Sequence, residues 1–243
     1  MSTNNRTPIT KNNFMDCLKD LGKEYRKAYG KNFTAEIILI GGGAVLAKYS
    51  FRELTYDVDA ILKLAPGIKG IASKVADKYS LPPNWLNDDF TATASFAEKL
   101  VQVSRHYRQF SNVLNIRIVD AEYLLAMKLM SGRQYKYDLS DIVGIVHEHS
   151  ITGNPIKKED AVKAFYDLYG KDAVMPDVSK DLLNKVFDDI DLKQLYLHTR
   201  QEEENSKELL LEFDSRYPKV LSIDNTNSIL EELKQREQNS KKD

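Results

Sequence analysis

Two aspartates, Asp57 and Asp59, stand two positions apart in a short alternating segment, residues 56–62, that we expect to form a β-strand. Side chains at alternate positions of a strand point to the same face, so the two carboxylates would lie side by side. Burying two such groups without a partner is costly, because like charges repel. Mg²⁺ or Mn²⁺ resolves the conflict, and proteins usually share these ions with substrate phosphates. The spacing therefore predicts a metal site at Asp57 and Asp59.

A glycine triplet precedes the two acids and separates a predicted strand, residues 35–40, from a predicted helical segment at residues 44–49. Without a Cβ atom the backbone can approach a phosphate closely, and N–H groups at the start of a helix attract anions. We expect the amides of Gly42 and Gly43 to cradle phosphates. A glycine triplet alone is usually a turn, and Asp-x-Asp alone is common on exposed strands. The strand–turn–helix–strand order favours chemistry on a nucleoside triphosphate.

Lys128 is a lone charge on the apolar stripe of a helix predicted over residues 121–131. A lysine at such a position either extends its amine to solvent or meets a buried anion. We expect this amine to contact the triphosphate, since a charge on an apolar helix face needs a partner.

Four further polar residues are candidates for the site. Asp138 and Asp141 share one face at the start of a helix predicted over residues 138–149, where they either cap the helix or complete the site. Nothing in the sequence decides which of them is in the site. Arg52 could neutralise the leaving pyrophosphate, and Thr55 could bind a phosphate or orient Asp57. The alternatives are a surface arginine and a turn threonine.

The order Gly42-Gly43, thirteen residues, then Asp57-Val58-Asp59 resembles the signature of the nucleotidyltransferase superfamily that includes DNA polymerase β. The fuller string, with Arg52 and Thr55 ahead of the acids, resembles the bacterial AbiEii-like branch, found as toxins of abortive-infection and toxin–antitoxin systems. The resemblance covers residues 30–150. It also matches Lys128 and the helix bearing Asp138 and Asp141 to that branch's lysine and acid-bearing helix.

The resemblance implies a mixed sheet flanked by helices and Mg²⁺-dependent transfer of a nucleoside monophosphate from a nucleoside triphosphate such as ATP, with release of pyrophosphate. The implied acceptor is a hydroxyl of a tRNA or a protein, and an antitoxin partner is implied as well. Many members carry a third carboxylate on a later strand. Here the predicted strand at residues 113–119 offers Asn115 and Arg117 instead, and we expect Asp120 to cap the next helix. This departure favours a site of two acids and a lysine.

The pattern of elements predicts an α+β fold, in which a mixed nucleotidyltransferase-type sheet flanked by helices is followed by a helical C-terminal region. We place a nucleotidyltransferase domain at residues 1–150 and a helical domain at 151–243, with a frayed tail from about residue 231, where little can be buried. One long helix or two with a break are expected between residues 179 and 217.

The composition excludes several classes of protein. The net charge of −1 argues against a protein that binds nucleic acid by bulk positive charge, and a single cysteine excludes a disulfide framework. Neither a secretory signal nor a membrane span is evident, so we expect a cytoplasmic protein with no membrane partner. Residues 105–108 are interpreted as a solvated helix face rather than an RNA contact, and residues 201–204 as a solvated acidic face.

Two rival functions remain open. One is an antibiotic-type nucleotidyltransferase with a small-molecule acceptor, which an acidic acceptor cleft would favour over a basic one. The other is a non-catalytic binding or antitoxin-like module on the same fold. Loss of one of the two aspartates would favour that module, and both are present.

Overall fold

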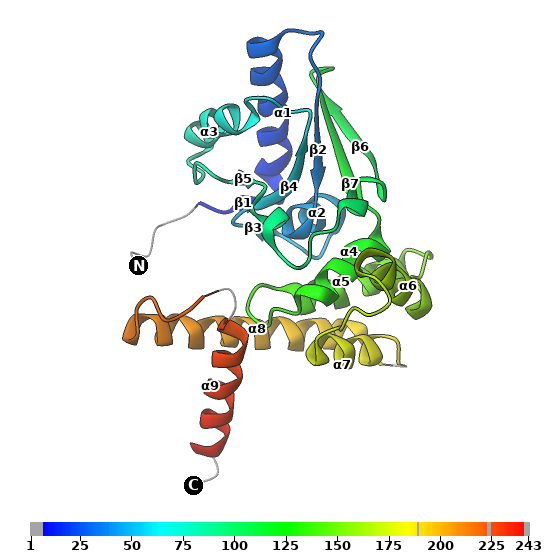
Figure 1. The fold of residues 1–243 in the computed structure, drawn as a ribbon, viewed down its shortest axis with the longest axis vertical. Coiled ribbons are helices and arrows are strands. Elements are labelled where there is room, and N and C mark those ends of the chain that lie inside the picture. Colours follow the sequence, from blue (N-terminus) through cyan, green and yellow to red (C-terminus); the bar gives the residue numbers. More distant parts are fainter. Residues whose placement is uncertain (1–6, 189, 223–224, 241–243) are drawn as a thin grey trace.

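The computed structural model describes residues 7–188, 190–222 and 225–240 and has the predicted α+β architecture. Its centre is a five-stranded mixed sheet in the order β5-β4-β2-β7-β6 (Figure 1). Strands β2 (Ala35–Leu39) and β7 (Leu114–Val119) run parallel, and β4 (Val58–Lys63) pairs antiparallel with β2. The sheet edges are β5 (Leu86–Asn87), parallel to β4, and β6 (Ser104–Phe110), antiparallel to β7.

The helices that flank this sheet come from the N-terminal part of the chain. The structure has α1 (Lys11–Tyr29), α2 (Gly41–Lys48) and α3 (Ile68–Tyr79), two 3₁₀ turns, η1 (Asp89–Ala92) and η2 (Glu98–Val101), and a two-stranded ribbon of β1 (Ile9–Thr10) and β3 (Leu54–Thr55). Cys17 is fully buried in α1, and burial raises the pKa of its thiol to about 12, as expected for a packed core residue. The pair α1 and α3 lie together beside the sheet (Figure 1).

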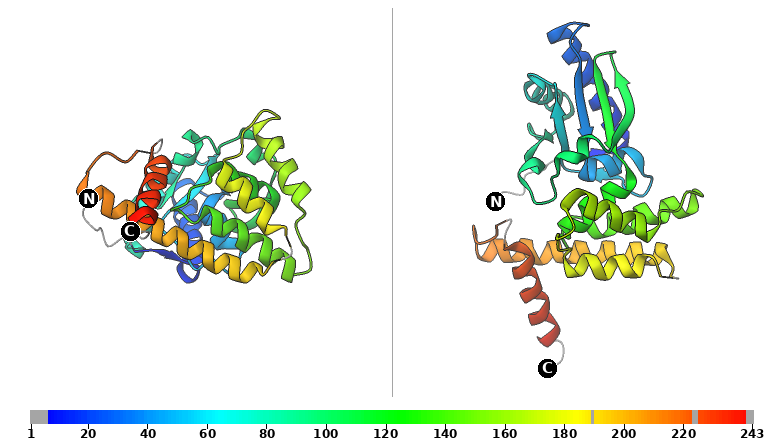
Figure 2. Two further views of the ribbon diagram at one scale, coloured as in Figure 1. Left: turned by 90° about the horizontal axis from the view of Figure 1, so that it is seen from below. Right: turned by 45° about the vertical axis from the view of Figure 1, so that its right-hand side comes forward.

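The remaining helices form a separate layer below the sheet (Figures 1 and 2). They are α4 (Ala121–Ser131), α5 (Asp138–Ile151), α6 (Lys158–Tyr169), α7 (Asp177–Val186), α8 (Leu192–Arg216) and α9 (Thr226–Ser240). Within this layer α4 packs on α6, and α5 packs on α8. The long predicted helical stretch is therefore two helices, α7 and α8.

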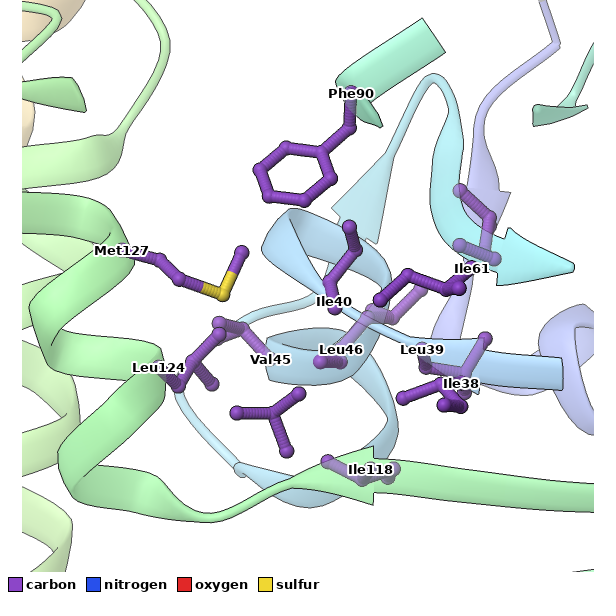
Figure 3. Packing of buried hydrophobic residues seen from close by; sticks show 14 of the residues in the cluster. Ile38, Leu39, Ile40, Val45, Leu46, Ile61, Phe90, Ile118, Leu124 and Met127 are labelled. Carbon is purple, nitrogen blue, oxygen red and sulfur yellow. The ribbon is translucent and has the colours of Figure 1, made fainter. Parts of the chain in front are cut away.

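Helix α2 connects the two layers. Leu124 and Met127 of α4 point toward α2, whose Val45 and Leu46 are buried between α4 and the sheet (Figure 3). Ile40, at the end of β2, is also fully buried there. The glycine triplet at the start of α2 is thus fixed in the core of the protein rather than in a free loop.

Three expectations about secondary structure are corrected. Residues 105–108 belong to strand β6 and not to a helix, because the backbone of this polar segment pairs with β7 at the sheet edge. Beyond residue 231 the chain continues as helix α9, which is anchored by the buried Leu230 and by a hydrogen bond from Lys234 Nζ to Gln134 Oε1 of 2.9 Å. Asp57 precedes β4, which begins at Val58.

Among the described residues no helix is long and apolar enough to cross a membrane.

Replacing Gly43 by alanine should destabilise the protein by about 1–3 kcal/mol, because the new Cβ would overpack the contact between α2 and β4. That atom would lie 2.8 Å from Cγ1 of Val58. Gly70, inside α3, has nothing within 4 Å of the equivalent position, so Gly70→Ala should stabilise the protein by up to about 1 kcal/mol through helix propensity. Urea unfolding of both variants measures the two effects, and equal effects would contradict the tight packing at Gly43.

Candidate functional site

A cleft of about 430 Å³ opens where the end of the sheet faces the layer of helices. Its walls come from α2, the start of β4, residues 82–95, α4, the α4–α5 connection and α9. The predicted residues that line it are Asp57, Asp59, Lys128 and Asp138, and they are joined by Gly41, Arg133 and Lys136.

Asp57 and Asp59 reach the cleft from one loop and the strand that follows it. The main-chain N–H of Ile40 donates to the Asp59 carbonyl at 3.2 Å, which ties the end of β2 to Asp59. Thr55 Oγ1 donates to the Asp57 carbonyl at 2.9 Å, so Thr55 orients the main chain that carries Asp57. Thr55 itself is buried and does not line the cleft.

Gly41 is the glycine of the triplet that faces the cleft. It has a positive φ of 53°, and a Cβ at this position would lie 3.2 Å from Oδ2 of Asp59. The side of Gly42 that would carry a Cβ faces Arg52 and Thr55 instead, and that of Gly43 faces Val58. Helix α2 has no side-chain cap, so the amide groups of its first turn stay available to an anion.

Negative charge exceeds positive charge among the described residues that line the cleft. The carboxylates are Asp57, Asp59, Asp89 and Asp138, and the cations are Lys128, Arg133 and Lys136. Burial, and then the Asp57 carboxylate, raise the pKa of Asp59 to about 6, although Arg133 and Lys128 act in the opposite direction. Ionised Asp59 is therefore held at an energetic cost beside Asp57.

This cost should make the metal-free protein less stable as the pH rises from about 4 to about 6. A carboxyl with a raised folded-state pKa keeps its proton in the folded chain after the unfolded chain has lost it, so stability falls across this window. Urea unfolding in the presence of a chelator measures the free energy of unfolding at each pH. Asp59→Asn should lack this component, and identical pH slopes in both proteins would contradict the raised pKa.

Lys128 meets buried anions within the protein. Its Nζ lies 2.6 Å from Asp138 Oδ1 and 2.9 Å from Asp141 Oδ2, and both aspartates are fully buried. Arg52 Nη1 donates to both carboxylate oxygens of Asp141 at 2.7 Å, and Arg133 Nε donates to Asp138 Oδ2 at 2.7 Å. We call these five residues the buried charge cluster.

Each charged group in this cluster stabilises the ionised form of its oppositely charged neighbours. Burial opposes ionisation of Asp138, but Lys128 and Arg133 outweigh it and hold the pKa of Asp138 well below its usual range. Burial likewise opposes the charge on Lys128, yet Asp138 and Asp141 raise its pKa. The three cations exceed the two aspartates by one charge, and Lys128, Arg133 and Asp138 are the members that line the cleft. Asp141 and Arg52 lie behind them.

Neither aspartate caps α5, because Glu203 of α8 does so from another part of the chain. Its carboxylate accepts from the main-chain N–H groups of Leu139 at 2.8 Å and Ser140 at 3.3 Å. Glu203 is 1% exposed, so the interpretation of residues 201–204 as a wholly solvated face is wrong at this position. A contact across more than 60 residues leaves no local signal in the sequence.

The remaining predicted polar residues lie outside the cleft. Asp120 precedes α4 without capping it, because its carboxylate accepts from Arg105 Nε at 2.7 Å and 2.8 Å. Arg117, on the strand where many members carry a third carboxylate, donates to the carbonyls of Val101 and Ser104. The cleft is also lined by residues that were not predicted, among them Asn84, Asn87 and Asn227. These residues form no recognisable local motif in the sequence.

The donors in the cleft suit a hard divalent cation. Asp57 and Asp59 offer carboxylate oxygens and line the same cleft. A Cβ on Gly41 would crowd Oδ2 of Asp59, so the glycine leaves room beside that oxygen. No group of three or more His, Cys, Asp or Glu side chains is placed to hold a metal among the described residues. The two aspartates therefore fit an ion that takes its remaining ligands from a substrate and water, as Mg²⁺ does.

Comparison with known proteins identifies one family. A family model described as "nucleotidyltransferase of unknown function (DUF6036)" matches residues 16–167. This match spans more than half of the chain and includes the sheet, the two aspartates and the buried charge cluster. No curated protein and no solved structure matches the chain.

Proposed function

Since the chain belongs to this family of nucleotidyltransferases, we propose that it transfers a nucleoside monophosphate from a nucleoside triphosphate to an acceptor hydroxyl and releases pyrophosphate. The observation that carries the proposal is that Asp57 and Asp59 line one cleft together with Lys128, Arg133 and Lys136. We call these three cations the cationic wall. The two acids would supply ligands for a divalent cation, and Lys128, Arg133 and Lys136 would supply positive charge for phosphates.

The charge balance of the cleft supports dependence on a metal. The buried charge cluster carries one net positive charge, so Asp57, Asp59 and Asp89 stand against that charge and Lys136, and one negative charge is in surplus. A triphosphate alone would be repelled by this surplus of negative charge. Asp57 and Asp59 would hold Mg²⁺, and the ion would supply charge neutralisation and Lewis acidity at the phosphates.

The chain's own residues would position the reactants. Ion pairs hold Lys128 against Asp138 and Asp141, and Arg133 against Asp138, so the two cations would present a preorganised positive charge to the phosphates. Helix α2 begins at Gly41, which lines the same cleft, and its uncapped first turn would add hydrogen-bond donors for an anion. Arg52 would act from behind this wall through Asp141, and not by direct contact with pyrophosphate.

Radiolabelled nucleotides test the proposal. The protein is incubated with α-labelled nucleoside triphosphates and Mg²⁺ together with total tRNA or total protein in separate reactions. We expect label in one acceptor fraction, lost on addition of a chelator. A third reaction contains aminoglycoside-type small molecules as acceptors. Absence of label transfer in all three reactions would overturn the proposal. Label on the small molecules alone would favour the antibiotic-type function.

We further propose that the acceptor is a macromolecule and that the protein acts as a toxin of a toxin–antitoxin or phage-defence system. The support is the resemblance of the Gly-Gly and Asp-x-Asp segment to the AbiEii-like branch. Expression in a bacterial host tests this setting: growth arrest that requires Asp57 and Asp59 supports it, and unimpaired growth with active protein contradicts it.

A further inference from the structure

The residues that line the cleft fall into two chemically different sets. The loop before β4, β4 itself, α4, the α4–α5 connection and the start of α5 supply all the charged side chains except Asp89. Apart from Asp89, the segment at residues 82–95 and helix α9 contribute neutral side chains, with hydrogen-bonding groups that include Asn84, Asn87 and Asn227. A nucleoside triphosphate divides in the same way, because its phosphates carry the charge and its nucleoside carries neutral donors and acceptors.

Asn227, in the first turn of α9, is the most distinctive of the neutral groups. It lines the cleft, and its Oδ1 is buried without a hydrogen-bond partner among the described residues. A buried acceptor left without a partner is unfavourable, and most such atoms in proteins are satisfied. The amide oxygen would gain a hydrogen bond from a ligand in the cleft that offers it a donor.

The position of Asn227 is fixed by contacts on the rest of α9. Leu230 is fully buried, and Lys234 Nζ donates to Gln134 Oε1, in the connection between α4 and α5. The same connection carries Arg133 and Lys136 into the cleft. Helix α9 therefore holds Asn227 in register with the cationic wall although it comes from the far end of the sequence.

An amide is suited to read a nucleobase, because it donates and accepts hydrogen bonds in one plane, as a base edge does. Aromatic side chains add a stacking surface, and Phe90, in the segment at residues 82–95, lines the same cleft. We propose that Asn227 is a specificity-determining residue that recognises the base of the donor nucleotide. This inference rests on the proposed function, since it assigns the neutral residues of the same cleft, from the segment at residues 82–95 and from α9, to the nucleoside.

Binding of the four nucleoside triphosphates tests the proposal separately from catalysis. Calorimetric titration of non-hydrolysable analogues with Mg²⁺ is carried out on the wild type, Asn227→Ala and Ser228→Ala, an exposed neighbour on the same helix. Alanine favours the helix, so both variants should keep α9 folded. We expect the wild type to prefer one base, Asn227→Ala to lose about tenfold or more of that preference, and Ser228→Ala to keep it.

Each other outcome has a defined meaning. An equal loss of affinity for all four nucleotides, or an unchanged preference, in Asn227→Ala overturns the role of Asn227 and leaves nucleotidyl transfer intact. A base preference that depends on Asn227 without label transfer supports the role of Asn227 and overturns the proposed function. Failure of the wild type to bind any of the four analogues overturns both.

Discussion

Asp59→Asn should lower nucleotidyl transfer by about a thousandfold or more while the folded protein becomes more stable above about pH 6. Loss of a carboxylate ligand removes several kcal/mol of the stabilisation that a bound cation gives to phosphate charge, and about 4 kcal/mol corresponds to a thousandfold in rate. The gain in stability has a separate cause. The raised pKa of Asp59 means that its charge is held unfavourably in the folded state.

Opposite effects on activity and stability separate a functional residue from a structural one. Transfer rates and urea unfolding are measured on the same preparations of Asp59→Asn, Asp57→Asn and Asp77→Asn. Asp77 is an exposed aspartate on α3 that does not line the cleft, and it provides the same chemical change as a control. An active Asp59→Asn protein, or an inactive one that has lost stability, would contradict the assignment.

Single replacements in the buried charge cluster should have the largest effects on stability. Arg52→Met removes the closest partner of Asp141 and leaves that carboxylate paired with Lys128. Asp141→Leu leaves the guanidinium of Arg52 buried without the carboxylate that it pairs with. The side chains of Arg52 and Asp141 are 6% and 0% exposed. Removal of one partner from such a pair typically costs about 3–5 kcal/mol, because the other charge stays buried and uncompensated.

The double variant Arg52→Met with Asp141→Leu should be more stable than either single variant. It removes a positive and a negative charge together and leaves Lys128 paired with Asp138. Urea unfolding of the four proteins forms a double-mutant cycle. Arg105→Met breaks the exposed pair with Asp120, where Arg105 is 81% exposed, and should cost at most about 1 kcal/mol. Additive losses in the cycle would contradict the coupling.

Segments with strong apolar periodicity were predicted well. The helix over residues 121–131 has the predicted bounds, and strand β2 lies within residues 35–40. Burial dictates these elements, and it is visible locally in the sequence as spacing of apolar residues. Strand β6 was missed because its Arg105–Arg108 stretch is exposed at a sheet edge, where pairing with β7 and not alternation determines the conformation.

Four of the charged residues that line the cleft were predicted from local patterns, but their partners were not. Asp57, Asp59, Lys128 and Asp138 meet in one cleft, as their spacing and the resemblance suggested. The cap on α5 by Glu203 and the pairing of Arg52 with Asp141 join residues that are far apart in the chain. Such contacts depend on how α8 and the α2–β3 connection pack, which no short window of sequence contains.

The fate of the α-phosphate tests the central claim most directly. Parallel reactions contain the same nucleoside triphosphate labelled at the α- or at the γ-phosphate, with Mg²⁺ and the acceptor fraction. If the protein transfers a nucleoside monophosphate, the α label enters the acceptor and the γ label leaves in pyrophosphate. The Asp59→Asn variant should neither label the acceptor nor release labelled pyrophosphate. Transfer of the γ label to the acceptor, or α-label transfer that survives in Asp59→Asn, would contradict the account.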